Sequence, residues 1–381
     1  MRIAIFTDTY KPQVNGVSMT LQRFANYLER RNFEYQLFVP EAKEDDLYSS
    51  QIHRFTSMPF LFYPECRFTF PNFYQIKKEL KQFNPDLIHI ATPFNIGLSG
   101  LYYGSKLKIP IVGSYHTHFN RYLDYYNLQL MSNVIWKYMR WFHQPFLKTF
   151  VPSHETKREL LQHGFNNIGI WSRGVDCEKF KPDYTTEALR EKHGIKEKFI
   201  LTYVGRLAPE KDLDILMKVA HQLTPEIKKH IHWLIVGDGP MKEKLELEAT
   251  DNMTFTGYLK GKELAQTYAG STLFVFPSTT ETFGNVVLES LASGTPAICA
   301  KSGGVQEIVT DQKTGLLCRP RNIEDFRIAI SKLIENEALV QQMSYEARNF
   351  ALSRSWDDIF DDLVAQYEEV LLDDQQIISY A

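Results

Sequence analysis

The chain has 381 residues, of which 44% are hydrophobic and 13% aromatic, and its formal net charge at pH 7 is −3. This length favours two domains, and the hydrophobic content is sufficient for a core in each of them. The acidic balance and the lack of a recognised motif argue against a nucleic-acid-binding protein, and no apolar run reaches the length of a transmembrane helix.

The first half of the chain alternates strand-like and helix-like segments. Short apolar runs predict strands, and apolar residues at intervals of three and four predict helices. This order predicts a parallel sheet covered on both faces, with ligands beyond the carboxyl ends of its strands. The predicted elements are strand 3–6, helix 16–30, strand 35–39, helix 73–83, strand 87–90, helix 97–107 and strand 111–114.

The same alternation begins again near residue 199, so two doubly wound α/β domains in tandem fit better than one very large sheet. The boundary is expected near residues 170–185, and an amphipathic helix over residues 356–372 is expected to brace the first domain. The predicted elements of this half are strand 200–204, helix 213–223, strand 232–236, helix 241–249, strand 254–255, helix 262–269, strand 273–276, helix 286–292 and strand 296–300.

Charge divides unevenly along the chain. Residues 1–175 hold 20 Lys and Arg against 13 Asp and Glu, and the remainder holds 23 against 33, so the total of −3 divides into +7 and −10. A basic half is typical of an anionic partner, although a chance distribution of solvated charges explains it equally well. The N-terminal strand, followed by Asp8, does not fit a signal peptide. The four cysteines lie far apart, so we expect reduced thiols and a cytoplasmic protein.

The most informative segment, residues 281–289, places Glu281 and Glu289 eight positions apart around a Phe-Gly-Asn stretch. Glu281 is expected in the loop after a strand, and Glu289 about two turns into the next helix. The N-terminus of that helix offers N–H groups to a phosphate, and the two carboxylates can accept hydrogen bonds from sugar hydroxyls. The segment therefore predicts a nucleotide-sugar site, against the alternative of a surface loop with two solvated acids.

Six segments in this order resemble the retaining GT-B glycosyltransferases of family four, and the likeness spans nearly the whole chain. The N-terminal segment looks most like bacterial members that glycosylate membrane lipids: diacylglycerol glucosyltransferases, sulfoquinovosyl-diacylglycerol synthases and GDP-mannose-dependent mannosyltransferases. The six segments are residues 1–17, 114–118, 172–176, 204–211, 236–240 and 281–289.

The resemblance implies two Rossmann-like domains that face each other across a cleft. Residues 1–175 would form the acceptor-binding domain, and residues 176–360 the domain that binds the nucleotide sugar. Residues 361–381 would cross back to brace the first domain.

The resemblance also assigns roles in donor binding. Arg206 and Lys211 would hold the diphosphate and neutralise the leaving group. Glu281 would bind the donor sugar near its reacting carbon, and Glu289 the ribose hydroxyls. The remaining donor contacts implied are Gly16 at a phosphate, Phe283, Gly284, Asn285 and Val286 through backbone groups, Tyr258 and Leu259 at the base, and Gly237 and Asp238 beside the pocket.

On the acceptor side, His116 matches a family histidine that contacts the transferring sugar. His118 lies two residues on, so we expect only one of the two to point into the cleft if the segment is extended, and we favour His116. Asp124 is a further candidate for acceptor contact. Arg173 stands where many relatives have asparagine, which leaves its role open, although a cation there could help to hold phosphate.

The chemistry expected is transfer of a hexose to an acceptor hydroxyl with retention at the anomeric carbon. No aspartate-any-aspartate motif lies in a suitable loop, so we expect no required metal and no cofactor besides the donor. UDP-glucose and GDP-mannose are both open as donors. A membrane lipid, a glycolipid, a soluble sugar and a polysaccharide are open as acceptors. A nucleotide-sugar epimerase and a non-catalytic binding protein of the same fold are the rival interpretations.

Residues 128–148 are rich in aromatic side chains, with Lys137, Arg140 and Lys148 among them. One interpretation is a segment that lies at a lipid interface, so that the protein works at the inner face of the membrane. The other is a buried helix of the first domain.

Overall fold

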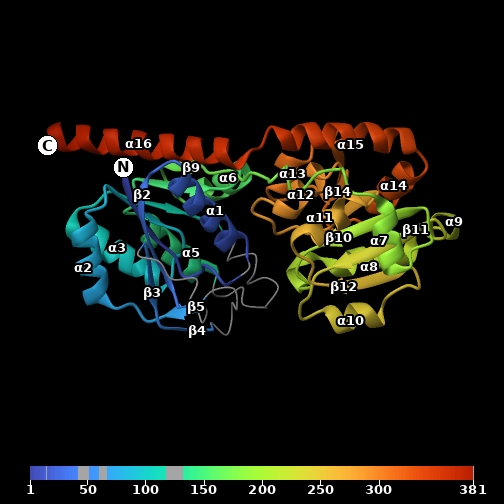
Figure 1. Ribbon diagram of the computed structural model, residues 1–381, viewed down its shortest axis with the longest axis horizontal. Coiled ribbons are helices and arrows are strands. Elements are labelled where there is room, and N and C mark those ends of the chain that lie inside the picture. The colour runs from blue at the N-terminus through green and yellow to red at the C-terminus, as the bar shows by residue number, and fades with distance from the viewer. Residues whose placement is uncertain (14, 42–50, 60–66, 117–131, 381) are drawn as a thin grey trace. The chain divides into compact units, whose positions relative to one another are not determined.

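The structure is a computed structural model that describes residues 1–13, 15–41, 51–59, 67–116 and 132–380. The described chain forms two compact units (Figure 1). Unit 1 contains the described residues up to 116, residues 132–172 and the C-terminal residues from 357. Unit 2 contains residues 173–356.

Unit 1 is built on a parallel sheet in which β1 and the strands beside it are buried on both faces. Ile3 of β1 pairs with Tyr35 on one side and with Leu87 on the other. Such near-continuous apolar runs are typical of a sheet that helices cover on both sides. In the described residues the strand order is β3-β2-β1-β6-β7-β8-β9. The strands are β1 (Arg2–Phe6), β2 (Glu34–Pro40), β3 (Ile52–Phe55), β6 (Leu87–Ile90), β7 (Ile111–Ser114), β8 (Lys148–Val151) and β9 (Ile168–Ile170).

The helices of unit 1 begin at recognisable caps. Asn15, Asn72 and Ser153 each accept a hydrogen bond from a backbone N–H in the first turn of the helix that follows. These helices are α1 (Gly16–Arg30), α2 (Phe73–Phe83), α3 (Asn95–Leu107), α5 (Ser132–His143) and α6 (His154–Gln162). A small antiparallel hairpin, β4 (Ser57–Pro59) and β5 (Arg67–Thr69), precedes α2.

The C-terminal helix α16 (Trp356–Tyr380) lies along unit 1, beside α1 and β9 (Figure 1). Its Phe360 ring lies 5.2 Å from the Phe24 ring of α1. Gln366 donates to the Ile170 carbonyl at 2.9 Å, and Glu369 forms an ion pair with Lys148 at 2.8 Å. The buried apolar side chains of α16, which include Phe360, Leu363 and Tyr367, therefore pack against unit 1.

Unit 2 repeats the architecture with a parallel sheet of strand order β12-β11-β10-β13-β14-β15 in the described residues. Its strands are β10 (Phe199–Val204), β11 (Ile231–Val236), β12 (Met253–Gly257), β13 (Leu273–Phe276), β14 (Ala297–Ala300) and β15 (Gly315–Cys318). Its helices are α7 (Thr186–His193), α8 (Leu213–Gln222), α9 (Pro225–Lys228), α10 (Lys242–Leu247), α11 (Gly261–Ala269), α12 (Asn285–Ala292), α13 (Val305–Ile308), α14 (Ile323–Ile334) and α15 (Glu337–Leu352).

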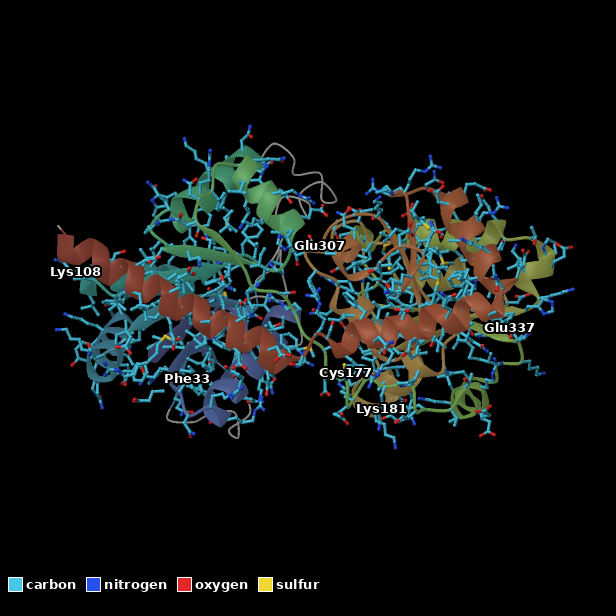
Figure 2. All side chains as sticks on the ribbon, turned by 90° about the horizontal axis from the view of Figure 1, so that it is seen from above. Phe33, Lys108, Cys177, Lys181, Glu307 and Glu337 are labelled. Atoms are coloured by element: carbon cyan, nitrogen blue, oxygen red, sulfur yellow. The ribbon has the colours of Figure 1, made fainter. Side chains whose placement is uncertain are left out.

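The predicted fold class, two Rossmann-like α/β domains, is confirmed. Helices 16–30 and 73–83 and strands 87–90, 111–114 and 273–276 have the predicted bounds. Helix 241–249 was predicted too long, because α10 ends at Leu247. Six short described strands, β3, β4, β5, β8, β9 and β15, were not predicted. Cys177, Cys299 and Cys318 have free thiols, and Cys177 is labelled in Figure 2.

Candidate active site

The loop between β13 and α12 leads into the helix through a glycine with positive φ. Gly284 has a φ of +104° and caps α12 at its N-terminus. A Cβ at this position would stand 2.8 Å from the Cγ2 of Val305. Both the backbone conformation and the available space therefore require glycine here, as only this residue adopts that φ at little cost.

The N-terminus of α12 presents backbone N–H groups that have no acceptor within the helix. Val287 donates to the Gly284 carbonyl at 3.0 Å. The N–H groups of Asn285 and Val286, one and two positions earlier, precede any intrahelical acceptor. They point out of the helix end, where the helix dipole is positive. An anion such as a diphosphate is stabilised at this position.

Lys211 and Glu281 form an ion pair that joins two loops of unit 2. The Lys211 Nζ lies 2.5 Å from Oε1 of Glu281, and the side chains are 15% and 18% exposed. This low exposure makes the pair stronger than a surface ion pair, because less solvent screens it. The cation and the acid that sequence analysis assigned to the diphosphate and the hexose are therefore in direct contact.

Hydrogen bonds hold these two loops in register. The Thr280 hydroxyl donates to the Glu210 carbonyl at 2.9 Å. The Asp212 carboxylate accepts from the backbone N–H of Thr279 at 3.1 Å and from its hydroxyl at 2.7 Å. The residues on either side of Lys211 thus bond to the two residues before Glu281, which explains why the pair forms.

Arg206 lies near a buried carboxylate in the same loop. Its Nη1 is 3.8 Å from Oε1 of Glu210, which is fully buried. The backbone carbonyl of Arg206 accepts a bond from the Tyr203 hydroxyl at 3.1 Å, and burial raises the pKa of Tyr203. At 3.8 Å the Glu210 carboxylate attracts the Arg206 guanidinium electrostatically, and the two groups are too far apart for a hydrogen bond.

Two consecutive glycines in the loop after β14, Gly303 and Gly304, pack against the backbone of the Glu281 loop. Gly304 donates its N–H to the Glu281 carbonyl at 3.0 Å. A Cβ on Gly303 would stand 2.1 Å from the same carbonyl oxygen, and a Cβ on Gly304 would stand 2.3 Å from the Thr282 oxygen. The loop after β14 therefore approaches the Glu281 loop closely enough to exclude any side chain at these positions.

Glu289, in the second turn of α12, is partly exposed and contacts a buried tyrosine. The Tyr268 hydroxyl donates to Oε2 of Glu289 at 3.3 Å. Burial raises the pKa of Tyr268 well above its ordinary value, and the nearby Glu289 carboxylate adds to the shift. Tyr268 therefore stays protonated and orients the carboxylate that sequence analysis assigned to the ribose.

The turn after β11 packs tightly against the turn after β10. A Cβ on Gly237, whose φ is +140°, would stand 1.8 Å from the Gly205 oxygen. Asp238 accepts at its carbonyl from the Leu207 N–H at 2.9 Å. Gly237 also donates to the Gly257 carbonyl at 2.9 Å, which places it one residue from Tyr258. Tyr258 is 62% exposed, and Leu259 beside it is 9% exposed.

In unit 1, His116 follows the carboxyl end of β7. Its ring centroid lies 5.2 Å from that of Trp171 in an edge contact, and Trp171 is 1% exposed. Trp171 also contacts the buried ring of His89 at 5.4 Å, so the indole fixes one side of the His116 ring. His118 and Asp124 lie outside the described residues.

Gly16 is the first residue of α1, after the loop that follows β1. Its neighbour Asn15 accepts from the Ser18 N–H at 2.9 Å and donates to the Thr9 hydroxyl at 2.7 Å. The described loop residues also include Asp8, which accepts bonds from the first turn of α3, and burial raises the pKa of Asp8 to about 6. Gly16 and His116 belong to unit 1, and the other site residues named so far belong to unit 2.

Arg173, which departs from the family pattern, is 4% exposed. Burial lowers the pKa of its guanidinium to about 9. A cation so deeply buried requires compensating contacts, so a substitution at this position is expected to destabilise unit 2.

The predicted aromatic segment forms α5 over its described residues. Trp136, Met139 and Phe142 are buried in unit 1, whereas Val134 and Trp141 are 63% and 55% exposed. Most of this helix's apolar side chains thus pack inside the unit, and its outer face holds a valine and a tryptophan. Among the described helices, none combines the length and apolarity that crossing a membrane requires.

Asp212 and Asp214 are spaced as in an aspartate-any-aspartate motif. The Asp212 carboxylate accepts from Thr279 and from Nε of Arg321 at 2.9 Å, and Asp214 pairs with Lys218 at 3.4 Å. Within the described residues, no three His, Cys, Asp or Glu side chains are grouped as metal ligands.

The residues that position Arg206, the Glu281 loop and Glu289 were not predicted from the sequence. Glu210, Gly303, Gly304 and Tyr268 have no role in the predicted donor contacts. The pair of glycines in the loop after a buried strand, residues 303–304, was the available signal, because adjacent glycines there indicate a close backbone approach. A fully buried glutamate gives no such signal in the sequence.

Two family sequence models match this chain in tandem. The model described as Glycosyltransferase Family 4 matches residues 14–179, and the model described as Glycosyl transferases group 1 matches residues 185–350. A GDP-mannose-dependent alpha-mannosyltransferase of Mycobacterium tuberculosis is 32% identical over 378 residues, which cover 97% of each chain. The chain belongs to the GT-B glycosyltransferases of group 1 and family 4 that these two models describe. The predicted resemblance and the prediction of a sugar-transferring enzyme that uses a nucleotide sugar are confirmed.

Other relatives of this glycosyltransferase are named for different activities. The sulfoquinovosyl transferase SQD2 of Arabidopsis thaliana is 32% identical, and the match covers 93% of this chain and 71% of SQD2. An alpha-monoglucosyldiacylglycerol synthase of Streptococcus pneumoniae is 33% identical, over 83% of this chain and 75% of the relative.

Solved structures share the fold of this glycosyltransferase. A sucrose-phosphate synthase from Thermosynechococcus elongatus has a TM-score of 0.78 at 18% identity, covering 97% of this chain and 99% of that one. Anabaena HepE in complex with UDP and glucose has a TM-score of 0.76 at 19% identity, covering 97% and 100%. Both likenesses confirm the GT-B architecture.

Proposed function

We propose that this glycosyltransferase moves a hexose from a UDP or GDP sugar to a hydroxyl of a membrane lipid or glycolipid, with retention at the anomeric carbon. The observation that supports the donor half of this proposal is the contact of Lys211 with Glu281 in the loop that leads into α12. The cation and the helix N-terminus suit a diphosphate, and the carboxylate suits the hydroxyls of the sugar.

In the proposed reaction, the bond between the anomeric carbon and the diphosphate oxygen breaks as the bond to the acceptor oxygen forms on the same face. The leaving phosphate oxygen takes the proton of the acceptor hydroxyl, so the step needs no separate base. Arg206, Lys211 and the N–H groups at the start of α12 stabilise the negative charge that develops on the diphosphate. Glu281 orients the hexose and forms no covalent bond to it.

The other site residues take supporting roles in this proposal. Glu289 accepts hydrogen bonds from the ribose hydroxyls, with Tyr268 holding its carboxylate in position. Tyr258 and Leu259 lie against the base, because the exposed ring can stack on it. His116 contacts the transferring hexose from unit 1. No metal ion is required, so activity is expected to persist in the presence of a chelator.

The names of the relatives support the acceptor that we propose. One aligned relative is named for a diacylglycerol acceptor and another for sulfoquinovosyl transfer. The mannosyltransferases are named for GDP-mannose, and the HepE structure contains UDP and glucose. A lipid hydroxyl is therefore the acceptor we propose, with the enzyme working at the cytoplasmic membrane surface, and the donor base is the first quantity to measure.

Thermal shift of the purified protein against UDP, GDP, ADP and their hexose conjugates tests the donor site. A ligand at a hundred times its Kd adds about 2.7 kcal/mol to the free energy of unfolding, which is a clear shift. The shift is expected with one base and lost in Glu289→Ala. The exposed Glu243 of α10 supplies the matched control, since Glu243→Ala should shift like the wild type. No shift with any nucleotide would contradict the proposal.

A further inference from the structure

The exposed apolar side chains of unit 1 gather on the β4–β5 hairpin, α2 and α3. Over the described residues, this region holds a methionine and five aromatic side chains that are each between 40% and 79% exposed. We call this group the aromatic face, and it consists of Met58, Phe68, Phe70, Phe73, Tyr74 and Tyr102. Single exposed apolar residues need no explanation, but a contiguous group of them marks an interaction surface.

The fold produces this face by the alternation of β5 and by the start of α2. Thr69 is buried, so Phe68 and Phe70 on either side of it point outward, and their rings lie 5.4 Å apart edge to face. The Phe73 ring is 6.4 Å from the Tyr102 ring of α3. Asn95 of α3 donates to the Thr69 carbonyl at 2.8 Å, which ties the hairpin to the helix.

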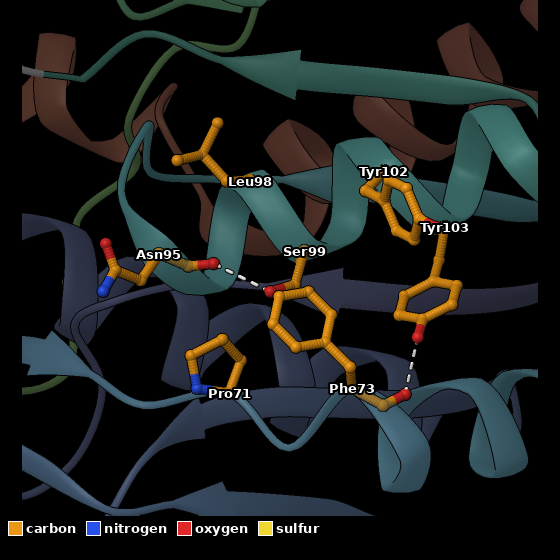
Figure 3. Close-up of a pocket in the computed structure, with 7 residues that line it drawn as sticks. All are labelled: Pro71, Phe73, Asn95, Leu98, Ser99, Tyr102 and Tyr103. Carbon is orange, nitrogen blue, oxygen red and sulfur yellow. Dashed lines mark hydrogen bonds between the residues drawn. The ribbon is translucent and has the colours of Figure 1, made fainter.

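A cavity of 610 Å³ opens within this face (Figure 3). The rings of Phe73, Tyr102 and Tyr103 line it together with Pro71 and Leu98. Its polar groups are already engaged inside the protein. The Tyr103 hydroxyl donates to the Phe73 carbonyl at 2.7 Å, and the Ser99 hydroxyl donates to the Asn95 carbonyl at 2.9 Å, as the dashed lines in Figure 3 show. The cavity therefore offers apolar surface and few polar groups to a sugar or a nucleotide.

Lysines border the aromatic face. Lys77, Lys78 and Lys81 are exposed on α2, where helical spacing places Phe73, Lys77 and Lys81 along one stripe. Buried Ile76 and Leu80 lie on the neighbouring side of α2, which packs into the core of unit 1.

Two lysines border α3 in the same way. At its C-terminal end, the Lys106 Nζ lies 5.1 Å above the Tyr102 ring and 2.9 Å from its hydroxyl. Lys108, labelled in Figure 2, follows the helix. The two helices together contain four lysines and a single acid, Glu79.

We propose that the aromatic face and its lysines dock unit 1 on the surface of an anionic lipid bilayer. Aromatic side chains favour the boundary between head groups and acyl chains, and lysines beside them are attracted to anionic head groups. The four lysines and single acid of the two helices give this face a positive charge, which an anionic bilayer complements. This inference rests on the proposed lipid acceptor, which such a surface would bring within reach. It also places the contact on the hairpin, α2 and α3, and not on residues 128–148, for which a lipid interface was one of two interpretations.

Flotation of the full chain with vesicles tests this surface. We expect binding to phosphatidylcholine vesicles that contain about 30 mol% phosphatidylglycerol, weaker binding to pure phosphatidylcholine, and a loss of binding as salt increases. Phe70→Ser with Tyr74→Ser should lower the partition coefficient at least tenfold. The triple change of Lys77, Lys78 and Lys81 to glutamine should lower it at least tenfold and remove most of the salt dependence.

Matched controls come from exposed residues of unit 2 and from α5. Tyr345→Ser with Leu352→Ser, at positions that are 68% and 52% exposed, should leave binding unchanged. Trp141→Ser should change binding less than twofold. Each variant must keep the wild-type Tm, so that a folding defect is not read as lost binding.

The outcomes separate this surface from the proposed function. The nucleotide-induced thermal shift and transfer to an acceptor dispersed in detergent report the proposed function, and both should persist in the aromatic and lysine variants. If the wild type binds no vesicle, or if these variants bind as well as the wild type, the docking surface is overturned even where transfer in detergent is observed. A larger loss of vesicle binding in Trp141→Ser than in Phe70→Ser with Tyr74→Ser would also contradict the proposed docking surface.

Discussion

The ammonium group of Lys211 lies 2.5 Å from a carboxylate oxygen of Glu281, across 70 residues of sequence. The pair brings the cation proposed for the diphosphate to the acid proposed for the hexose. Since Thr279 and Thr280 bond to the loop of Lys211, this contact is built by the fold and does not depend on a ligand. A donor that binds here meets two charged groups whose positions are already set, which lowers the cost of organising them during the reaction.

Replacing Lys211 with alanine should lower kcat/KM at least a hundredfold, or about 2.7 kcal/mol, because the leaving diphosphate loses a cation. Glu281→Gln should lower kcat more than it changes KM, as it keeps the shape and removes the charge. Steady-state kinetics with the donor found by thermal shift measure both effects.

The control for Lys211 is Lys218→Ala. Lys218 forms an exposed pair with Asp214, so its removal should change kcat/KM less than twofold. Equal effects of the two lysine substitutions would mean that Lys211 has no special relation to the donor.

Gly303→Ala should reduce activity far more than Gly261→Ala. Both glycines have a left-handed φ, +62° and +58°, so an alanine costs each a similar backbone strain of about 1 kcal/mol. Only at Gly303 would the new Cβ meet backbone, 2.1 Å from the Glu281 oxygen, whereas it meets nothing within 4 Å at Gly261.

We therefore expect Gly303→Ala to displace the Glu281 loop and lower kcat at least tenfold, and Gly261→Ala to change kcat less than threefold. The Tm of both variants and their kcat with the same donor provide the comparison. A kcat for Gly303→Ala close to that of Gly261→Ala would show that the loop position does not limit the reaction.

His116→Ala should lower the rate of transfer while leaving the nucleotide-induced thermal shift intact, because His116 lies in unit 1 and is proposed to contact the hexose. Loss of a hydrogen bond made to the reacting sugar is expected to cost about one hundredfold in kcat. His118→Ala is the comparison that sequence reasoning suggests, and it should cost less. A larger loss in His118→Ala would reverse our choice between the two histidines.

His143 is expected to make unit 1 sensitive to acid. The imidazole is buried among Phe142, Phe146 and Phe165, and burial lowers its pKa to about 3, against an ordinary value of 6.5. The unfolded chain therefore binds a proton below pH 6.5 that the folded chain rejects. Stability is lost as the pH falls from 6.5 toward 3, by about 3 kcal/mol at pH 4.

Replacing His143 with leucine should remove this contribution, so that the Tm difference between variant and wild type grows as the pH is lowered from 7 to 4. His154→Gln, at an exposed histidine of the same unit, should leave the wild-type pH dependence unchanged. A constant Tm difference between His143→Leu and wild type across this range would contradict the assignment.

The order of strands and helices could be predicted because apolar periodicity is local. Residues 273–276 and 286–292 were read correctly as strand and helix, which placed Glu281 in a loop and Glu289 two turns into α12. The partners of these acids could not be predicted. Tyr268 of α11 lies 21 residues from Glu289 of α12, so their contact depends on how these two helices pack. The glycines that support Glu281 follow β14, so that contact depends on how β13 and β14 pair.

Burial of polar groups also lay beyond sequence reasoning. Nothing in the pattern around Glu210 distinguishes it from a solvated glutamate, yet the fold buries it completely beside Arg206. The aromatic segment of α5 shows the opposite case. Its composition left both a lipid interface and a buried helix open, and Trp136 and Phe142 are buried, whereas exposed aromatic side chains gather on the hairpin and α2.

Transfer of a hexose from a nucleoside diphosphate sugar with retention is tested most directly by the anomeric configuration of the product. This configuration is measured by proton NMR after incubation with a diacylglycerol acceptor in detergent and the α-linked nucleotide sugar that gives a thermal shift. We expect an α-linked glycolipid and one nucleoside diphosphate released for each sugar transferred, with both lost in Lys211→Ala. A β-linked product, or release of nucleotide without any glycolipid from lipid acceptors, would contradict it.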